Sequence, residues 1–380
     1  MKLPREMQER RQATNPLFNS NKMKLGVFGH NCANGCAITT AEGHLKATWP
    51  SARAISVMAD RAGLEALVPV ARWRGFGGPT NFNGASFETY SWAAGLGAAT
   101  DHAAVFSTSH VPTVHPIMAA KQATTIDHIS GGRFALNVVC GWFRSELEMF
   151  GAPLREHDLR YEYAAEWLEI VLQLWTAEEE FDYEGKYFQI KRGFHEPKPI
   201  QHPFPAVMNA GGSEVGHRFA AKYADMVFTH VRENDDQARD KVDYLRRLAR
   251  EEFGREIQVW DHAYVVCRPT EKEARDYLHY YVREKGDWEA VNNLISNFTM
   301  PPGMTPEAVE TLKFNFAAGW SGFPLVGTAE KIVSDLEWLA RIGLDGCLLS
   351  WVNYETELPQ FVAEVLPLME QAGLRKPFRP

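Results

Sequence analysis

The stretch RFALNVVCG, residues 133–141, belongs to a series of short apolar or β-branched runs that alternate with longer segments of helical period from Met23 onward. This alternation is what parallel βαβ units produce. The series contains eight candidate strands, at residues 25–30, 66–72, 103–111, 133–141, 206–211, 226–231, 259–267 and 346–352. Eight parallel strands with intervening helices predict an α/β fold, a single closed (β/α)8 TIM barrel.

The helices between these runs carry signals of their own. In 157–177 and in 329–342, apolar residues recur at helical spacing, so each segment has one apolar face. Thr328 stands where an N-cap belongs and Gly343 where a left-handed C-cap belongs, which marks both ends of the second segment. A final helix is expected over 357–373.

Composition and charge exclude several classes of protein. The 380 residues are 45% hydrophobic, enough to bury a large core. Forty basic residues against 48 acidic ones leave a net charge of -8, which disfavours a nucleic-acid partner because phosphate binding needs a basic stripe. No run of 18 or more apolar residues occurs, so we expect no membrane span.

The N-terminus and the cysteines both indicate a cytoplasmic protein. Residues 1–22 are polar and lack the apolar core of a signal peptide, so we expect an N-terminal arm followed by one barrel domain over 23–380. Five cysteines are an odd number in a large chain without a secretion signal, and we expect free thiols.

Two segments do not fit a minimal barrel, residues 178–205 and 286–325. Both combine proline and glycine with aromatic residues, which favours long ordered excursions over linkers. We expect them to cover the active site, and 286–322 is either a mobile lid or a fixed loop.

The turn after the fifth strand offers a phosphate site. Gly211, Gly212 and Ser213 lead into a helix, so bare N–H groups, a hydroxyl and the helix dipole can meet at one point. An ordinary strand-to-helix turn with Ser213 as N-cap explains the same residues. Arg160 and Tyr161 could add a second clamp, or be a surface arginine and a packed tyrosine.

Two polar residues lie inside strands that should be buried. Asn137 and Thr108 each need a hydrogen-bond partner there, and each is either satisfied in the core or addresses a ligand. The remaining candidates are weaker. Cys32 and Cys36 lack a second cysteine pair for zinc, so we expect no metal site. His30, His110 and His115 lie near strand ends and could donate to a substrate.

Three segments resemble the bacterial-luciferase-like flavin-dependent monooxygenases: RGFGG (74–78), SFETYSWAAGLGAAT (86–100) and above all ATTIDHISGGRFALNVVCGW (123–142). The resemblance covers residues 23–373. It is greatest to the subgroup that contains the pyrimidine (uracil) and dimethylsulfone monooxygenases. The fold it implies is the barrel that the strand count predicts.

The resemblance also implies roles for individual residues. Thr108 and Asn137 match the pair beside the flavin edge where oxygen reacts, and are therefore the expected catalytic residues. Arg72 stands where the pyrimidine enzyme has a lysine. The residues implied to contact FMN are Ala71, Arg72, Asn137, Glu146, Arg160, Tyr161, Gly211, Gly212 and Ser213.

The implied activity is that of a two-component monooxygenase. A separate NAD(P)H-dependent flavin reductase supplies reduced FMN, by transient contact or by diffusion, and a flavin peroxide formed with O2 oxygenates a small N-heterocycle or organosulfur compound. A homo-oligomer, dimer or tetramer, is expected. Two rivals stay open: a deazaflavin-dependent hydride-transfer enzyme and a flavin-binding protein without catalysis. Because residues 30–44, 109–116 and 286–322 do not match the pyrimidine enzyme, the resemblance does not identify the substrate.

Overall fold

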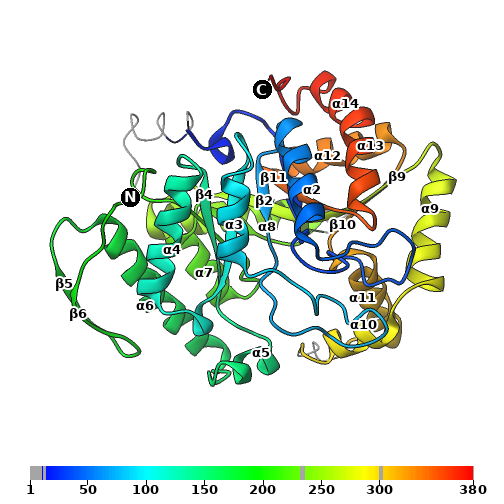
Figure 1. The fold of residues 1–380 in the computed structure, drawn as a ribbon. Coiled ribbons are helices and arrows are strands. Elements are labelled where there is room, and N and C mark those ends of the chain that lie inside the picture. Colours follow the sequence, from blue (N-terminus) through cyan, green and yellow to red (C-terminus); the bar gives the residue numbers. More distant parts are fainter. Residues whose placement is uncertain (1–10, 12–13, 232–235, 299–302, 380) are drawn as a thin grey trace. The chain divides into compact units, whose positions relative to one another are not determined.

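The computed structural model describes residues 11, 14–231, 236–298 and 303–379 (Figure 1). Its contacts divide the chain into two compact units, which are taken in turn. The first unit comprises Met1–Asn19, Glu88–Thr229 and Asp243–Val259, and the second comprises Ser20–Phe87, His230–Val242 and Trp260–Pro380.

The first unit contains four parallel strands paired in the order β3 (Ala104–His110), β4 (Phe134–Val139), β7 (Ala206–Asn209) and β8 (Met226–Phe228). Its helices are α3 (Thr89–Gly97), α4 (Pro116–Ile129), α5 (Arg144–Met149), α6 (His157–Thr176) and α7 (Glu214–Tyr223), and α8 (Asp236–Phe253) begins in the range of the second unit. Short 3-10 turns occupy Pro16–Phe18 and Val111–Thr113.

The second unit contains five parallel strands paired in the order β2 (Ala66–Val68), β1 (Lys24–Phe28), β11 (Gly346–Ser350), β9 (Gln258–Cys267) and β10 (Phe323–Gly327). Its helices are α2 (Trp49–Arg61), α9 (Glu271–His279), a π-helical turn (Tyr280–Glu284), α10 (Trp288–Ile295), α11 (Pro306–Gly319), α12 (Ala329–Ile342), α13 (Tyr354–Glu364) and α14 (Leu366–Gln371).

All eight expected strands are present and parallel, and the fold is the TIM-barrel-like α/β fold that they predict. Helix α12 has the expected bounds, with Thr328 as N-cap and Gly343 in the left-handed region at φ 105°. The final helix expected over 357–373 is wrong: α13 and α14 replace it. The chain breaks at Val365 because Pro367, in the first turn of α14, has no N–H to continue α13.

The excursion at 178–205 forms a hairpin of β5 (Phe181–Glu184) and β6 (Gln189–Gly193), which lies beyond α6 in Figure 1. Glu166 of α6 accepts the N–H groups of Lys186, Tyr187 and Phe188, so one carboxylate holds the hairpin turn. Further on, Ile200 and Gln201 bond to Asp127 of α4. Phe188 and Tyr187 of the hairpin turn also contact His115, which follows β3, and Arg155, which precedes α6. The segment is thus anchored on α4 and α6, and its role as an active-site cover stays a prediction.

The motif that carries the resemblance holds the amino ends of two strands together. Arg133, one residue before β4, donates to three carbonyl oxygens at 2.6 to 3.1 Å: that of Gly97, the last residue of α3, and those of Thr100 and Ala103 in the loop that leads to β3. It also donates to Thr100 Oγ1 at 3.2 Å. The buried guanidinium thereby satisfies the C-terminal end of α3. The motif is therefore structural at this position, since it lies at the amino ends of the strands, away from the carboxyl ends where barrel enzymes place their active sites.

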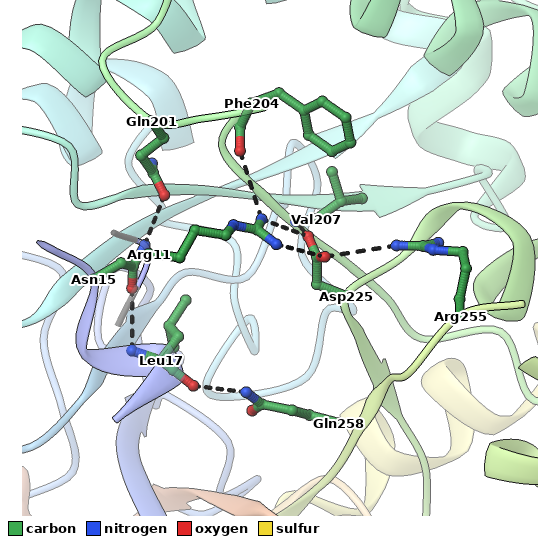
Figure 2. Close-up of polar contacts among 9 residues, drawn as sticks. All are labelled: Arg11, Asn15, Leu17, Gln201, Phe204, Val207, Asp225, Arg255 and Gln258. Atoms are coloured by element: carbon green, nitrogen blue, oxygen red, sulfur yellow. Dashed lines mark hydrogen bonds and ion pairs between the residues drawn. The ribbon is translucent and has the colours of Figure 1, made fainter. Parts of the chain in front are cut away.

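The described part of the N-terminal arm packs on the first unit (Figure 2). Arg11 makes a bidentate ion pair with Asp225, which also accepts the N–H of Val207 and lies 3.5 Å from Arg255. Leu17 is fully buried and its carbonyl accepts from Gln258. Residues 1–10, 12 and 13 of the expected arm lie outside the described residues. In the described part of the chain, no helix combines the length and the apolar character that crossing a membrane requires.

Candidate active site

The side chains of Thr108 and Asn137 meet on the face of the β3–β4 pair. The two residues are in register across the parallel strands, and Asn137 Nδ2 donates to Thr108 Oγ1 at 3.2 Å. Both side chains are buried, at 6% and 8% exposure. The polar pair is therefore buried in the sheet, as the sequence predicts.

The amide of Asn137 is only half satisfied by the protein. Among the described residues no hydrogen-bond donor reaches its Oδ1, although the atom is fully buried. If the amide nitrogen and oxygen of Asn137 exchange places, Thr108 still bonds to only one of the two amide atoms. A buried polar atom left unpaired costs about 1–3 kcal/mol, so this site favours a bound group that supplies the missing bond.

The turn after β7 exposes backbone toward open space. Ser213 is the N-cap of α7, and its Oγ accepts the N–H of Gly216 at 3.1 Å. A Cβ added to Gly212 would meet nothing within 4 Å, whereas Gly211 is buried and its N–H is held by Asn209 at 2.9 Å. The Ser213 hydroxyl also bonds to Tyr161, so the hydroxyl, the phenol and the start of α7 lie together at this turn.

Tyr161 and Arg160, in the first turn of α6, flank this turn. A Cβ built on Gly211 or Gly216 would lie only 2.9 or 2.6 Å from Tyr161 Oη, so the glycines let the phenol reach the backbone. Burial raises the pKa of Tyr161 to about 12, and the phenol therefore stays protonated and can donate. Arg160 Nη1 donates to the carbonyl of Gly141 at 3.3 Å, which places the guanidinium beside the loop after β4 and not in the turn after β7.

A second polar pair lies at the end of β3. His110, the last residue of the strand, has its Nδ1 3.4 Å from Oε2 of Glu146 on α5. The two side chains are 4% and 0% exposed. His110 follows Thr108 by two residues, so both side chains project from the same face of β3.

Ala71 and Arg72 belong to the second unit, after β2. Asn31 holds this loop by two side-chain bonds to the backbone of Val70, both 2.8 Å. The Arg72 guanidinium lies 4.9 Å from the ring centre of Phe76 and 5.9 Å from that of Trp320. Arg72 is thus fixed against aromatic faces within its own unit.

The excursion at 286–322 consists largely of α10 and α11 and lies in the second unit, with residues 299–302 outside the described residues. Asp287 caps α10 and accepts both the N–H and the hydroxyl of Thr80, at 2.8 and 2.6 Å. The carbonyl of Ala317 accepts the N–H of Ile38 at 3.0 Å. These bonds favour the fixed loop over the mobile lid.

The structure brings five of the ten expected site residues together in two groups of the first unit: Thr108 with Asn137, and Tyr161 with Gly211 and Ser213. Sequence reasoning missed the pairing of His110 with Glu146 and the contribution of Gly216. The two-residue spacing between Thr108 and His110 was the available signal for the first. The five cysteines are free and buried.

A family profile described as luciferase-like monooxygenase matches residues 23–346. The FMNH(2)-dependent dimethylsulfone monooxygenase of Pseudomonas putida is 28% identical over 363 residues, which cover 93% of this chain and 96% of the relative. Pyrimidine monooxygenase RutA of Bradyrhizobium sp. is 30% identical over 367 residues, covering 93% and 99%. The crystal structure of riboflavin lyase RcaE, at 22% identity, matches 93% of each chain with a TM-score of 0.83, a likeness of fold.

Proposed function

This chain belongs to the luciferase-like monooxygenase family, and from that premise we propose that it is a two-component monooxygenase that uses reduced FMN and O2 to oxygenate a small organic molecule. The observation that carries the proposal is the buried, half-satisfied amide of Asn137 beside Thr108. An isoalloxazine ring presents N–H groups and oxygens of the kind that such an amide pairs with.

The phosphate of FMN fits the turn after β7. Ser213 Oγ–H, the N–H groups at the start of α7 and the protonated Tyr161 are donors, and Arg160 adds a positive charge. Gly212 leaves the space for the group, because a side chain there would occupy the open position. Ala71, Arg72 and Glu146 are proposed contacts from the resemblance alone.

Bound reduced FMN would supply the two electrons with which O2 is split between substrate and water. The protein would bind the flavin and the substrate, orient them, and keep water away from the reacting atoms. Asn137 and Thr108 fix polar atoms in a buried position, where hydrogen bonds are stronger than in water and need no rearrangement during the reaction. Apolar walls exclude water that would otherwise divert the oxidant to H2O2.

The two relatives differ in substrate, dimethylsulfone in one name and a pyrimidine in the other. We propose a small organosulfur compound or N-heterocycle for this chain. We also propose that a separate NAD(P)H-dependent flavin reductase supplies FMNH2, that the enzyme is a cytoplasmic homo-oligomer, and that residues 23–380 form its catalytic domain behind the arm of 1–22.

A single-turnover screen tests the proposal. Protein loaded anaerobically with FMNH2 is mixed with organosulfur compounds or uracil-like heterocycles, O2 is admitted, and product masses are read. At least one compound should gain one oxygen atom with wild-type protein and much less with Asn137→Ala. Release of H2O2 alone with every compound would contradict a monooxygenase that acts on these classes.

A further inference from the structure

We propose that His110 is a catalytic acid–base residue of this oxygenation and that Glu146 is the residue that positions it. The inference rests on the proposed function. It is drawn from the geometry of β3 and α5, and both residues lie in the first unit.

The orientation of the imidazole is the first argument. Glu146 Oε2 lies 3.4 Å from His110 Nδ1, within ion-pair range but without the geometry of a hydrogen bond. An ionised carboxylate only accepts hydrogen bonds, so this neighbour favours the ring form that carries hydrogen on Nδ1. Catalytic bonds of this kind are often long before the ligand binds. His110 is consequently held as a base is held by a third group in nucleophile–base–carboxylate arrangements.

The second argument is the position of the other ring nitrogen of His110, Nε2. No described residue bonds to Nε2 of His110, whereas its Nδ1 faces Glu146 and its carbonyl is bonded to Thr113. The side chain projects from the same face of β3 as Thr108, whose hydroxyl contacts Asn137. The acid–base nitrogen therefore shares a face with the polar pair proposed to hold the reacting groups.

The chemistry needs such a residue. In the overall reaction, substrate, O2 and FMNH2 give oxygenated substrate, FMN and water. FMNH2 contributes two electrons and two protons, one oxygen atom joins the substrate and the other leaves as water. In the resting ring, hydrogen is on Nδ1 and Nε2 is free to accept. Nε2 first takes up one of the two protons released as FMNH2 is oxidised, and the resulting imidazolium faces the Glu146 carboxylate. Nε2–H then donates that proton to the departing oxygen as the O–O bond breaks, which completes the water and returns the ring to its resting form.

A role in packing alone is the competing explanation. A buried pair can be retained for structure, and removing one partner then destabilises the fold. His110→Gln separates the two roles, because glutamine keeps a side-chain hydrogen-bond donor but cannot transfer a proton. His279→Gln is the matched control, since His279 is an exposed histidine at the end of α9 and lies outside every site residue named above.

The first measurement is product formation per FMNH2 oxidised in a single turnover. His110→Gln should keep FMN affinity and melting temperature near wild type and lose product formation by about 10²-fold, the usual worth of a proton-transfer residue. In His110→Ala, added imidazole should restore part of the product, which it does not do in Asn137→Ala. Wild-type product formation in His110→Gln, with no rescue in His110→Ala, overturns the proposal.

The second measurement needs no turnover. ¹⁵N NMR of histidine-labelled protein without flavin reads which ring nitrogen of His110 carries hydrogen. We expect hydrogen on Nδ1 in the wild type and a mixture in Glu146→Gln, in which product formation also falls. A bare Nδ1 in the wild type overturns the inference even if no substrate is found. Absence of product from wild-type protein with every compound contradicts the proposed function instead, so the two failures are distinguishable.

Discussion

Arg11 and Asp225 are 214 residues apart in the sequence, yet two nitrogens of the Arg11 guanidinium donate to the two carboxylate oxygens of Asp225, at 3.0 and 3.1 Å (Figure 2). The pair is buried, and it joins the N-terminal arm to the residue that precedes β8. A chain segment that precedes every strand is thereby part of the first unit.

Arg11→Ala should lower the free energy of unfolding by about 3 kcal/mol, because the substitution leaves a buried carboxylate with the N–H of Val207 and, as its charged partner, only the more distant Arg255. Urea unfolding followed by circular dichroism measures the change. Lys272→Ala is the control: its pair with Asp276 is exposed and should be worth less than 1 kcal/mol. Equal effects of the two substitutions would contradict a structural role for the arm.

The same pair predicts a pH dependence. Burial raises the pKa of Asp225, but Arg11, Arg255 and the N–H of Val207 together outweigh burial, so the net pKa lies below the usual 3.8. A lowered carboxylate pKa stabilises the fold at neutral pH, and this contribution is lost as the pH falls through the folded-state pKa. The stability advantage of the wild type over Asp225→Asn should therefore shrink from neutral pH to about pH 3. An advantage that grows on acidification would show the opposite shift.

Asn137→Ala and Thr108→Val should each leave the fold intact and divert the reaction to H2O2. Each removes a polar group at the buried pair, and loss of one such preorganised group costs about 10²-fold in other enzymes. Product formed per FMNH2 oxidised is the quantity to measure. Ser107→Ala is the control on the same strand, because Ser107 bonds to the carbonyl of Thr89 and projects from the opposite face. Normal coupling in both site variants would leave the pair as core packing.

Tyr161→Phe should weaken the binding of FMN about tenfold and leave riboflavin binding unchanged, because the lost hydroxyl faces the phosphate position and a charge-assisted bond is worth about 1.5 kcal/mol. Tyr163→Phe, two residues along α6, should affect neither ligand. Isothermal titration with both flavins decides between the outcomes. Equal loss for FMN and riboflavin would place Tyr161 elsewhere than at the phosphate.

Helices α10 and α11 should exchange their amide hydrogens slowly already in the protein without ligand, since side-chain and backbone bonds anchor them. Asp287→Ala should speed exchange both in α10 and in residues 76–84, because Asp287 bonds to Thr80 as well as capping the helix. Hydrogen exchange by mass spectrometry reads both regions. Protection that arises only with flavin and substrate bound would restore the lid hypothesis for 286–322.

Signals within short segments of the sequence predicted more of this structure than could be predicted about contacts between residues far apart in the sequence. Thr328 and Gly343 predict the two ends of α12. The pairing of Thr108 with Asn137 follows once the two consecutive strands that carry them pair in parallel. The hairpin at 181–193 had no local signal, because its turn is held by Glu166 of a preceding helix. The contact between Glu146 and His110 depends on the orientation of the six-residue helix α5, which no periodicity in the sequence predicts.

The hydrogen bonds that Arg133 donates to the loop before β3 have a consequence for engineering. The DHISGGR signature identifies the scaffold, because its arginine donates hydrogen bonds to three carbonyl groups that precede β3. A search that ranks sequences by this signature sorts them by architecture and not by what they oxidise. A library aimed at new substrates should therefore leave residues 127–133 untouched and place its diversity in 32–44 and 111–116, which spares Asn31 and His110 as well as the bonds of Arg133.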